Sequence, residues 1–79
     1  MRLDKWLKVA RIIKRRTVAK EVCDAGRVFV NGRPAKAGTE LKIGDEVSLT
    51  LGQRTVKVRV LATPDTVRAN EAHTLYEEL

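Results

Sequence analysis

Closely spaced basic side chains dominate the first twenty residues of this 79-residue chain, and phosphate binding is the chemistry that such side chains perform. One set precedes an Ile-Ile pair and a second set follows it. Arginine suits phosphate because its planar guanidinium donates two parallel hydrogen bonds, whereas lysine contributes a compact point charge. The candidate phosphate-binding residues are Arg2, Lys5, Lys8, Arg11, Lys14, Arg15, Arg16 and Lys20.

The distribution of charge indicates a polyanionic partner. Residues 1–36 carry a net charge of +8, whereas residues 37–79 carry −2, which together give the +6 of the whole chain. A basic half beside a slightly acidic half favours one face built for nucleic acid, the alternative being a solvated surface without a ligand. Base stacking on single strands needs several exposed aromatic side chains, and the chain has three in all. Structured RNA, read through its shape and phosphates, is therefore the expected ligand.

The composition argues against catalysis. One cysteine and one histidine cannot build a zinc site, and no glycine-rich phosphate loop of the Gly-x-x-x-x-Gly-Lys type is present. The remaining polar residues form no set of nucleophile, base and orienting group. We therefore expect a protein that is not an enzyme and that needs no cofactor or metal. A single cysteine and apolar runs of at most three residues predict a soluble, cytoplasmic protein with no membrane contact.

The first basic set lies on a predicted helix. Its apolar face has the spacing i, i+3, i+4 and i+7, with Leu3, Trp6, Leu7 and Ala10. Asp4 falls in the first turn, where a carboxylate favours the exposed backbone N–H groups, and it can also pair with Lys8 one turn later. The helical pattern fails beyond Arg11 or Ile12, so the helix should end there. Because Trp6 follows the apolar spacing, we expect it in the core rather than stacked on a base.

The second basic set lies in a joint between two helices. Residues 12–16 form this joint, with the isoleucines turned inward and Lys14, Arg15 and Arg16 outward. Thr17 is the expected N-cap of a second helix over 18–25, whose inward residues would be Val18, Ala19, Val22 and Cys23. Gly26 fits the left-handed position just past its end.

The rest of the chain reads as strands. An apolar run over 27–30 precedes Asn31-Gly32, which is the strongest short signal for a hairpin. Alternating patterns over 46–51 and 56–60 indicate two half-buried strands. We expect an α+β fold of two helices packed on a small curled antiparallel sheet, with helix, joint and helix over 2–26 and the sheet over 27–62. Residues 63–79 form an extension whose spacing of Val67, Ala72, Leu75, Tyr76 and Leu79 permits a short final helix.

Several short motifs occur together in the first two-thirds of the chain. They are Arg2-Leu3-Asp4-Lys5-Trp6-Leu7, Arg15-Arg16-Thr17 with Ala19 and Glu21, Gly26-Arg27-Val28 and Val30-Asn31-Gly32. In combination they resemble the RNA-binding domain named after small-subunit ribosomal protein S-four (the alpha-L motif). Gly44-Asp45 before a hydrophobic strand fits the closing hairpin of that domain.

A chain of about eighty residues that begins Met-Arg-Leu-Asp-Lys resembles a narrower group, the bacterial ribosome-associated quality-control protein P (RqcP) family. The resemblance implies binding to large-subunit rRNA and to peptidyl-site tRNA on obstructed subunits. It also implies a partner on the same subunit, the quality-control factor that drives alanine tailing of the stalled chain. We expect the free protein to be a monomer.

Two alternatives remain open. A heat-shock-type ribosome recycling factor, related to the fifteen-kilodalton heat-shock protein, is the first, although those relatives usually carry a longer basic tail and this chain ends in Tyr76-Glu77-Glu78-Leu79. A protein-interaction adaptor, whose sheet or tail helix binds a partner, is the second.

Overall fold

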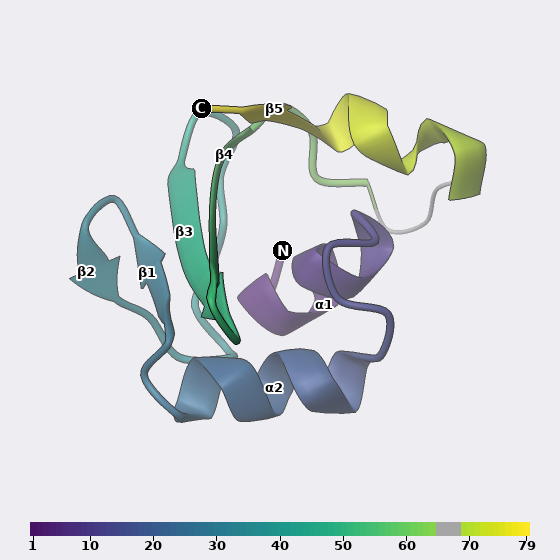
Figure 1. Ribbon diagram of the computed structural model, residues 1–79. Helices are drawn as coiled ribbons and strands as arrows, with labels where there is room; N and C mark the ends of the chain where they lie inside the picture. Colours follow the sequence, from purple (N-terminus) through teal and green to yellow (C-terminus); the bar gives the residue numbers. More distant parts are fainter. Residues whose placement is uncertain (65–68) are drawn as a thin grey trace.

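Two helices pack together against one face of a five-stranded antiparallel sheet, which confirms the predicted α+β fold (Figure 1). The computed structural model describes residues 1–64 and 69–79. The helices are α1 (Leu3–Val9) and α2 (Arg16–Asp24), and a 3-10 helix η1 spans Ala69–Leu75. The strands are β1 (Val28–Val30), β2 (Arg33–Pro34), β3 (Glu46–Leu51), β4 (Arg54–Val60) and β5 (Tyr76–Glu78).

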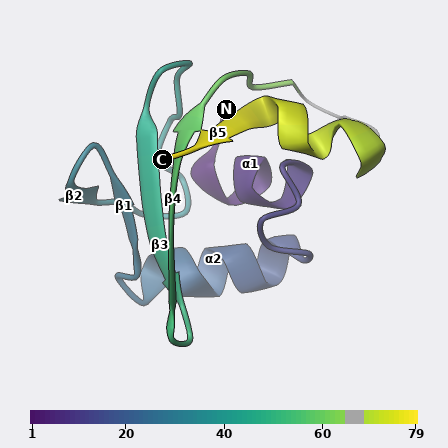
Figure 2. The ribbon, with the colours of Figure 1, turned by 45° about the horizontal axis from the view of Figure 1, so that its top comes forward.

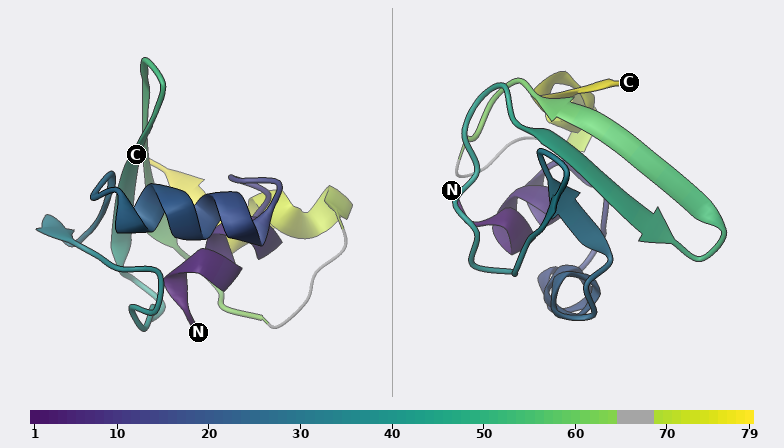
Figure 3. Two further views of the ribbon diagram at one scale, coloured as in Figure 1. Left: turned by 90° about the horizontal axis from the view of Figure 1, so that it is seen from below. Right: turned by 90° about the vertical axis from the view of Figure 1, so that its left-hand side faces the viewer.

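The sheet has the strand order β2-β1-β3-β4-β5, and every pairing is antiparallel. Alternate residues of the strands face the helices, so the predicted alternation is confirmed. The fully buried residues of this inner face are Val28, Val47, Leu49, Val58 and Val60. The β3–β4 hairpin is the longest pairing, and its tip extends past α2 (Figures 2 and 3). The tip of this hairpin therefore lies beyond the part of the inner face that α2 covers.

The predicted Asn31-Gly32 hairpin joins β1 to β2. Both residues have positive φ, +53° and +81°, as a two-residue hairpin turn of this kind requires. The side-chain amide of Asn31 donates to Oδ1 of Asp45 (3.1 Å), and its carbonyl accepts the backbone N–H of Glu46 (3.0 Å). Asn31 thus turns the chain and also ties this hairpin to the start of β3.

α1 ends at Val9, two residues before the predicted end, and its C-cap Ala10 is followed by a left-handed residue that is not glycine. Arg11 has φ +61°, its N–H donates to the Lys8 carbonyl (3.0 Å), and the N–H of Ile12 donates to the Leu7 carbonyl (3.1 Å). This pair of bonds closes a Schellman motif, in which the left-handed position usually holds glycine. α2 ends in the same motif with Gly26 at φ +76°, as predicted.

The start of α2 differs from the prediction. The helix begins at Arg16, so Thr17 lies in its first turn and is not the N-cap. Arg15 occupies the cap position with extended backbone, and within the described part of the chain no side chain caps this end. Val18, predicted to face inward, is 40% exposed. The rotation of the helix is set by burial of Ala19 and Cys23 against the core, and tertiary packing of this kind overrides a local capping preference.

The C-terminal extension adds a strand to the sheet. Ala69–Leu75 turns as a 3-10 helix, after which Tyr76–Glu78 pairs with β4 as the edge strand β5, which the helical pattern did not predict. Val67 lies outside the described residues. The indole N–H of Trp6 donates to the Ala62 carbonyl (2.9 Å), and its ring meets that of Tyr76 edge to face at 6.3 Å. Trp6 is fully buried, so its predicted place in the core is confirmed.

Candidate RNA-binding site

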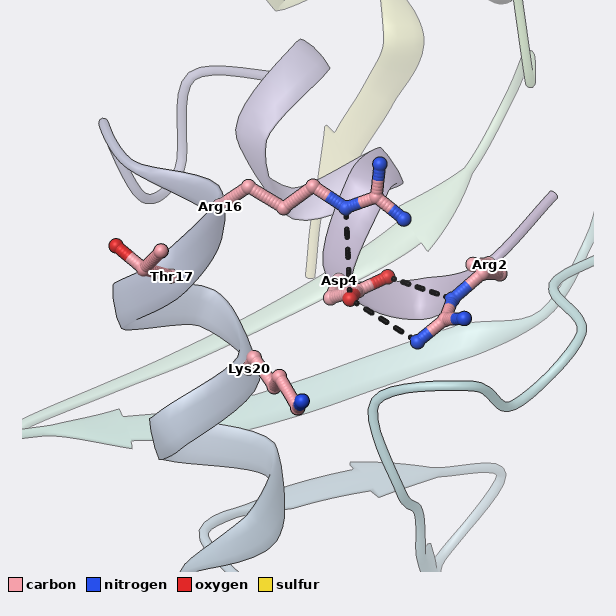
Figure 4. Close-up of a pocket in the computed structure, with 5 residues that line it drawn as sticks. All are labelled: Arg2, Asp4, Arg16, Thr17 and Lys20. Atoms are coloured by element: carbon pink, nitrogen blue, oxygen red, sulfur yellow. Dashed lines mark hydrogen bonds and ion pairs between the residues drawn. The ribbon is translucent and has the colours of Figure 1, made fainter.

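An open pocket of about 290 Å³ lies between the start of α1 and the start of α2 (Figure 4). Its lining residues are Arg2, Asp4, Arg16, Thr17 and Lys20. Arg2 is the residue before α1 and Asp4 lies in the first turn of that helix. The other three come from the first turns of α2. The packing of α1 on α2 thus brings together basic residues that are up to eighteen positions apart in sequence.

A buried carboxylate organises the two arginines of this pocket. Asp4 is 2% exposed, and its Oδ1 and Oδ2 accept from Nε (3.2 Å) and Nη2 (3.3 Å) of Arg2. Nε of Arg16 lies 3.5 Å from Oδ2. Both arginine side chains remain about half exposed, at 52% and 48%. In Figure 4 the dashed line from Asp4 reaches Arg16 at Nε and neither terminal nitrogen is joined to the carboxylate, so that guanidinium has donors left for a ligand.

This arrangement corrects the predicted pairing of Asp4. The helical spacing allows Lys8, one turn along α1, as a partner, but the carboxylate binds Arg2 and Arg16 instead. The reason is that Asp4, three residues before Leu7, borders the apolar face of α1 and turns toward α2. A solvent-facing intrahelical pair contributes only a few tenths of a kcal/mol, and a buried carboxylate needs stronger partners than that.

Asp4 is ionised in the folded protein. Its burial opposes the charged form, but the hydrogen bond from Arg2, the backbone N–H of Lys5 (2.8 Å to Oδ1) and the charge of Arg16 outweigh burial. Together they hold the pKa of Asp4 below its ordinary value. The pocket therefore contains three cations, Arg2, Arg16 and Lys20, and one anion, so that its formal net charge is +2.

The remaining predicted residues do not line the pocket. Lys5 is half-buried on α1, and the others are exposed on α1 and on the joint before α2. These outer residues are Lys5, Lys8, Arg11, Lys14 and Arg15. The pocket also contains Thr17, which the sequence pattern marked only as a helix cap.

Cys23 is fully buried, as its predicted inward position requires. Burial together with the charges of Asp4 and Asp24 raises the pKa of its thiol to about 11, so it stays protonated. Within residues 1–64 and 69–79 no three His, Cys, Asp or Glu side chains lie together in a way that could hold a metal ion. No helix in these ranges is both long and apolar enough to cross a bilayer.

Comparison with known proteins shows which family this chain is similar to. The S4 domain family matches residues 1–47. The RQC P-site tRNA stabilizing factor of Halalkalibacterium halodurans is 60% identical, over 98% of this chain and 88% of that protein. The protein of the same name from Bacillus subtilis is 53% identical, over 96% of this chain and 88% of its own length.

A solved structure has nearly the same fold. The trimeric structure of heat shock protein 15 from Vibrio cholerae aligns with a TM-score of 0.93 at 36% identity, over 100% of this chain and 81% of that one. The heat-shock protein is thus similar in fold but more distant in sequence than the two factors above. This chain belongs to the S4 domain family and, within it, to the group of the RQC P-site tRNA stabilizing factors.

Proposed function

We propose that this protein is a cytoplasmic RNA-binding factor of the large ribosomal subunit. It binds rRNA and peptidyl-site tRNA on obstructed subunits and supports alanine tailing of the stalled nascent chain by a separate quality-control factor. A role in ribosome-associated quality control and RNA binding follows from the family, and the particular RNA and protein partners are the proposed part. The binding unit comprises residues 1–62, with residues 63–79 as an extension.

The observation that supports this proposal most is the convergence of two arginines on one buried carboxylate. Arg2 and Arg16 are held by Asp4 from within and are half exposed to solvent. Arginines held in this way have already lost much of their rotamer freedom, so a phosphate binds them at a smaller entropic cost. The backbone N–H groups in the first turn of α2 lie beside the same pocket and favour an anion.

The other cations supply the weaker, long-range part of the interaction. Half-buried Lys5 and exposed Lys8 lie on α1, and exposed Arg11, Lys14 and Arg15 lie between the two helices. These residues extend the basic surface beyond the pocket. Exposed cations of this kind attract RNA through its phosphates without reading sequence, so affinity depends on salt. Selectivity for folded RNA then comes from the shape of the wall that the two helices form.

The proposal is tested by binding to large subunits that carry peptidyl-tRNA. Arg16→Ala and Arg2→Ala should each weaken co-sedimentation by about tenfold, because each removes a charge-assisted phosphate contact. Lys57→Ala is the matched control, since Lys57 is an exposed cation on β4, outside the pocket between α1 and α2. Circular dichroism should be unchanged in all three. Wild-type association by both arginine variants would remove the proposed site.

The similarity to heat shock protein 15 supports one alternative, a recycling factor that acts on a free subunit holding a stalled chain. Sequencing the C-terminal ends of nascent chains in a deletion strain separates the two functions. The quality-control role predicts that alanine tails disappear, whereas the recycling role predicts that the tails persist while obstructed subunits accumulate.

A further inference from the structure

The loop over residues 36–41 pairs with the first residues of the chain in the manner of a neighbouring strand. Arg2 and Glu40 face one another as an antiparallel bridge. Backbone hydrogen bonds flank this pair on both sides, from Leu3 N–H to the Thr39 carbonyl (2.9 Å), from Asp4 N–H to the Ala37 carbonyl (3.1 Å) and from Leu41 N–H to the Met1 carbonyl (2.8 Å). Arg2 therefore lies at the centre of the segment that pairs with this loop.

An ion pair between Met1 and Glu40 adds to this backbone pairing. In this chain the α-ammonium of Met1 donates to Oε1 of Glu40 (2.5 Å), and the Met1 side chain is 4% exposed. The head group of Arg2 also lies beside this loop, because a Cβ added at Gly38 would lie 3.9 Å from its guanidinium carbon. Residues 36–41 thus hold the backbone of Arg2 and lie beside its head group.

We propose that Glu40 is a positioning residue for Arg2, and that it acts through its ion pair with the α-ammonium of Met1. Chain ends are poorly ordered unless they are tied down, and Glu40 ties down the residue directly before Arg2. Neutralising Glu40, or blocking the ammonium with a formyl or acetyl group, releases this end. Arg2 then reaches Asp4 less often, and because this role presupposes the RNA binding proposed above, affinity for RNA falls.

The direction of the effect separates positioning from simple electrostatics. Glu40→Gln raises the net charge of the protein by one unit, which by itself favours binding to RNA. Positioning predicts the opposite, a loss of about two- to fivefold, which is the size expected for an exposed ion pair. Glu77→Gln is the matched control, because it makes the same charge change on β5, at the edge of the sheet. It should leave affinity unchanged or raise it slightly.

A double-mutant cycle with Arg2→Ala provides a readout that a merely structural role would not give. If Glu40 acts through Arg2, Glu40→Gln weakens binding to large subunits with peptidyl-tRNA in the wild-type background only. Nα-acetylation of a chemically synthesised chain should reproduce the loss and should add nothing to Glu40→Gln. A loss of the same size in the Arg2→Ala background, or unchanged binding by Glu40→Gln, would overturn the inference.

A measurement without RNA keeps this inference distinct from the proposed function. The Arg2 Nε–H proton is hydrogen-bonded to Asp4, so its NMR resonance should move toward that of a free arginine in Glu40→Gln and in the acetylated chain. An unmoved resonance contradicts the positioning role whatever the RNA measurements show. If the resonance moves and the wild-type protein fails to bind RNA, the proposed function is wrong and the positioning of Arg2 stands.

Discussion

Asp4 of α1 and Arg16 of α2 form an ion pair across the junction of the two helices, with 3.5 Å between Oδ2 and Nε. The same carboxylate accepts two hydrogen bonds from Arg2, so one buried anion fixes a cation from each helix. A single residue therefore links the two helices at this end and fixes the position of the groups that would meet phosphate.

Asp4→Asn should weaken RNA binding although it raises the net charge. An added charge about 6 Å from a phosphate is worth less than about 0.7 kcal/mol in water, and salt reduces it further. Freeing two arginines costs about 0.5–1.5 kcal/mol each when they must be reordered on binding. We therefore expect a loss of about 3- to 10-fold in affinity for large subunits with peptidyl-tRNA. Asp24→Asn, the same change at an exposed position on α2, serves as the control, and equal affinities for the two variants would contradict this account.

The contribution of Asp4 to stability should depend on pH in a defined direction. Its pKa is lowered in the folded protein, so its stabilising effect is fully present above the ordinary aspartate pKa of about 3.9 and is lost as the pH falls through the lower folded-state value. Guanidinium unfolding should show wild type more stable than Asp4→Asn at pH 7 and at pH 5. The difference should shrink below about pH 4. A difference that stays constant down to pH 2 would mean that the carboxylate charge is not what stabilises the junction.

Affinity for RNA should fall steeply with salt. If about five to seven phosphates are neutralised, the logarithm of the binding constant should fall against the logarithm of the salt concentration with a slope of about −4 to −6. Arg16→Ala should make this slope shallower by about one unit. Filter binding from about 50 to 300 mM salt measures both values, and a slope near zero would exclude electrostatic clasping as the main source of affinity.

Arg11 should carry conformational strain that the equivalent position of α2 avoids. A residue with a side chain costs about 1–2 kcal/mol in the left-handed region, and replacing it with glycine removes this strain. The freer unfolded chain of glycine cancels about 0.5–1 kcal/mol of that stabilisation. The free energy of unfolding should therefore be about 0.5–1 kcal/mol higher for Arg11→Gly than for Arg11→Ala. The alanine variant also lacks the guanidinium but keeps the backbone strain. Gly26→Ala should lower the free energy of unfolding by about 1 kcal/mol for the same reason, although a Cβ there has open space. Equal stability of the two Arg11 variants would show that the turn relaxes.

The Trp6 contacts should hold the C-terminal extension on the sheet. Trp6→Phe deletes the donor to the Ala62 carbonyl and part of the ring that meets Tyr76, and it should lower the free energy of unfolding by about 1–3 kcal/mol. Hydrogen exchange should be faster at two backbone amides that join β4 and its end to the C-terminal segment. The N–H of Leu61 donates to the Leu75 carbonyl, and the N–H of Leu79 donates to the Lys57 carbonyl. Unchanged exchange at these amides would indicate that β5 pairs independently of Trp6.

Local patterns in the sequence were sufficient to predict the two helices, the hairpin and the basic character of the first half. Each of these depends on neighbours a few residues apart. The apolar spacing of Leu3, Trp6 and Leu7 defines a helical face, and Asn31-Gly32 supplies the positive φ that a tight turn needs. Net charge is a property of composition alone, so the fold cannot alter it.

The tertiary structure decided which of these charges act together. Whether Asp4 pairs along its own helix or across to Arg16 depends on how α1 is rotated against α2, and that rotation is set by burial of distant residues such as Ala19. The role of residues 36–41 beside Arg2 and the pairing of β5 with β4 are contacts between segments far apart in the chain. Such contacts form because they complete a shared core and satisfy backbone groups, and these are conditions that no local pattern encodes.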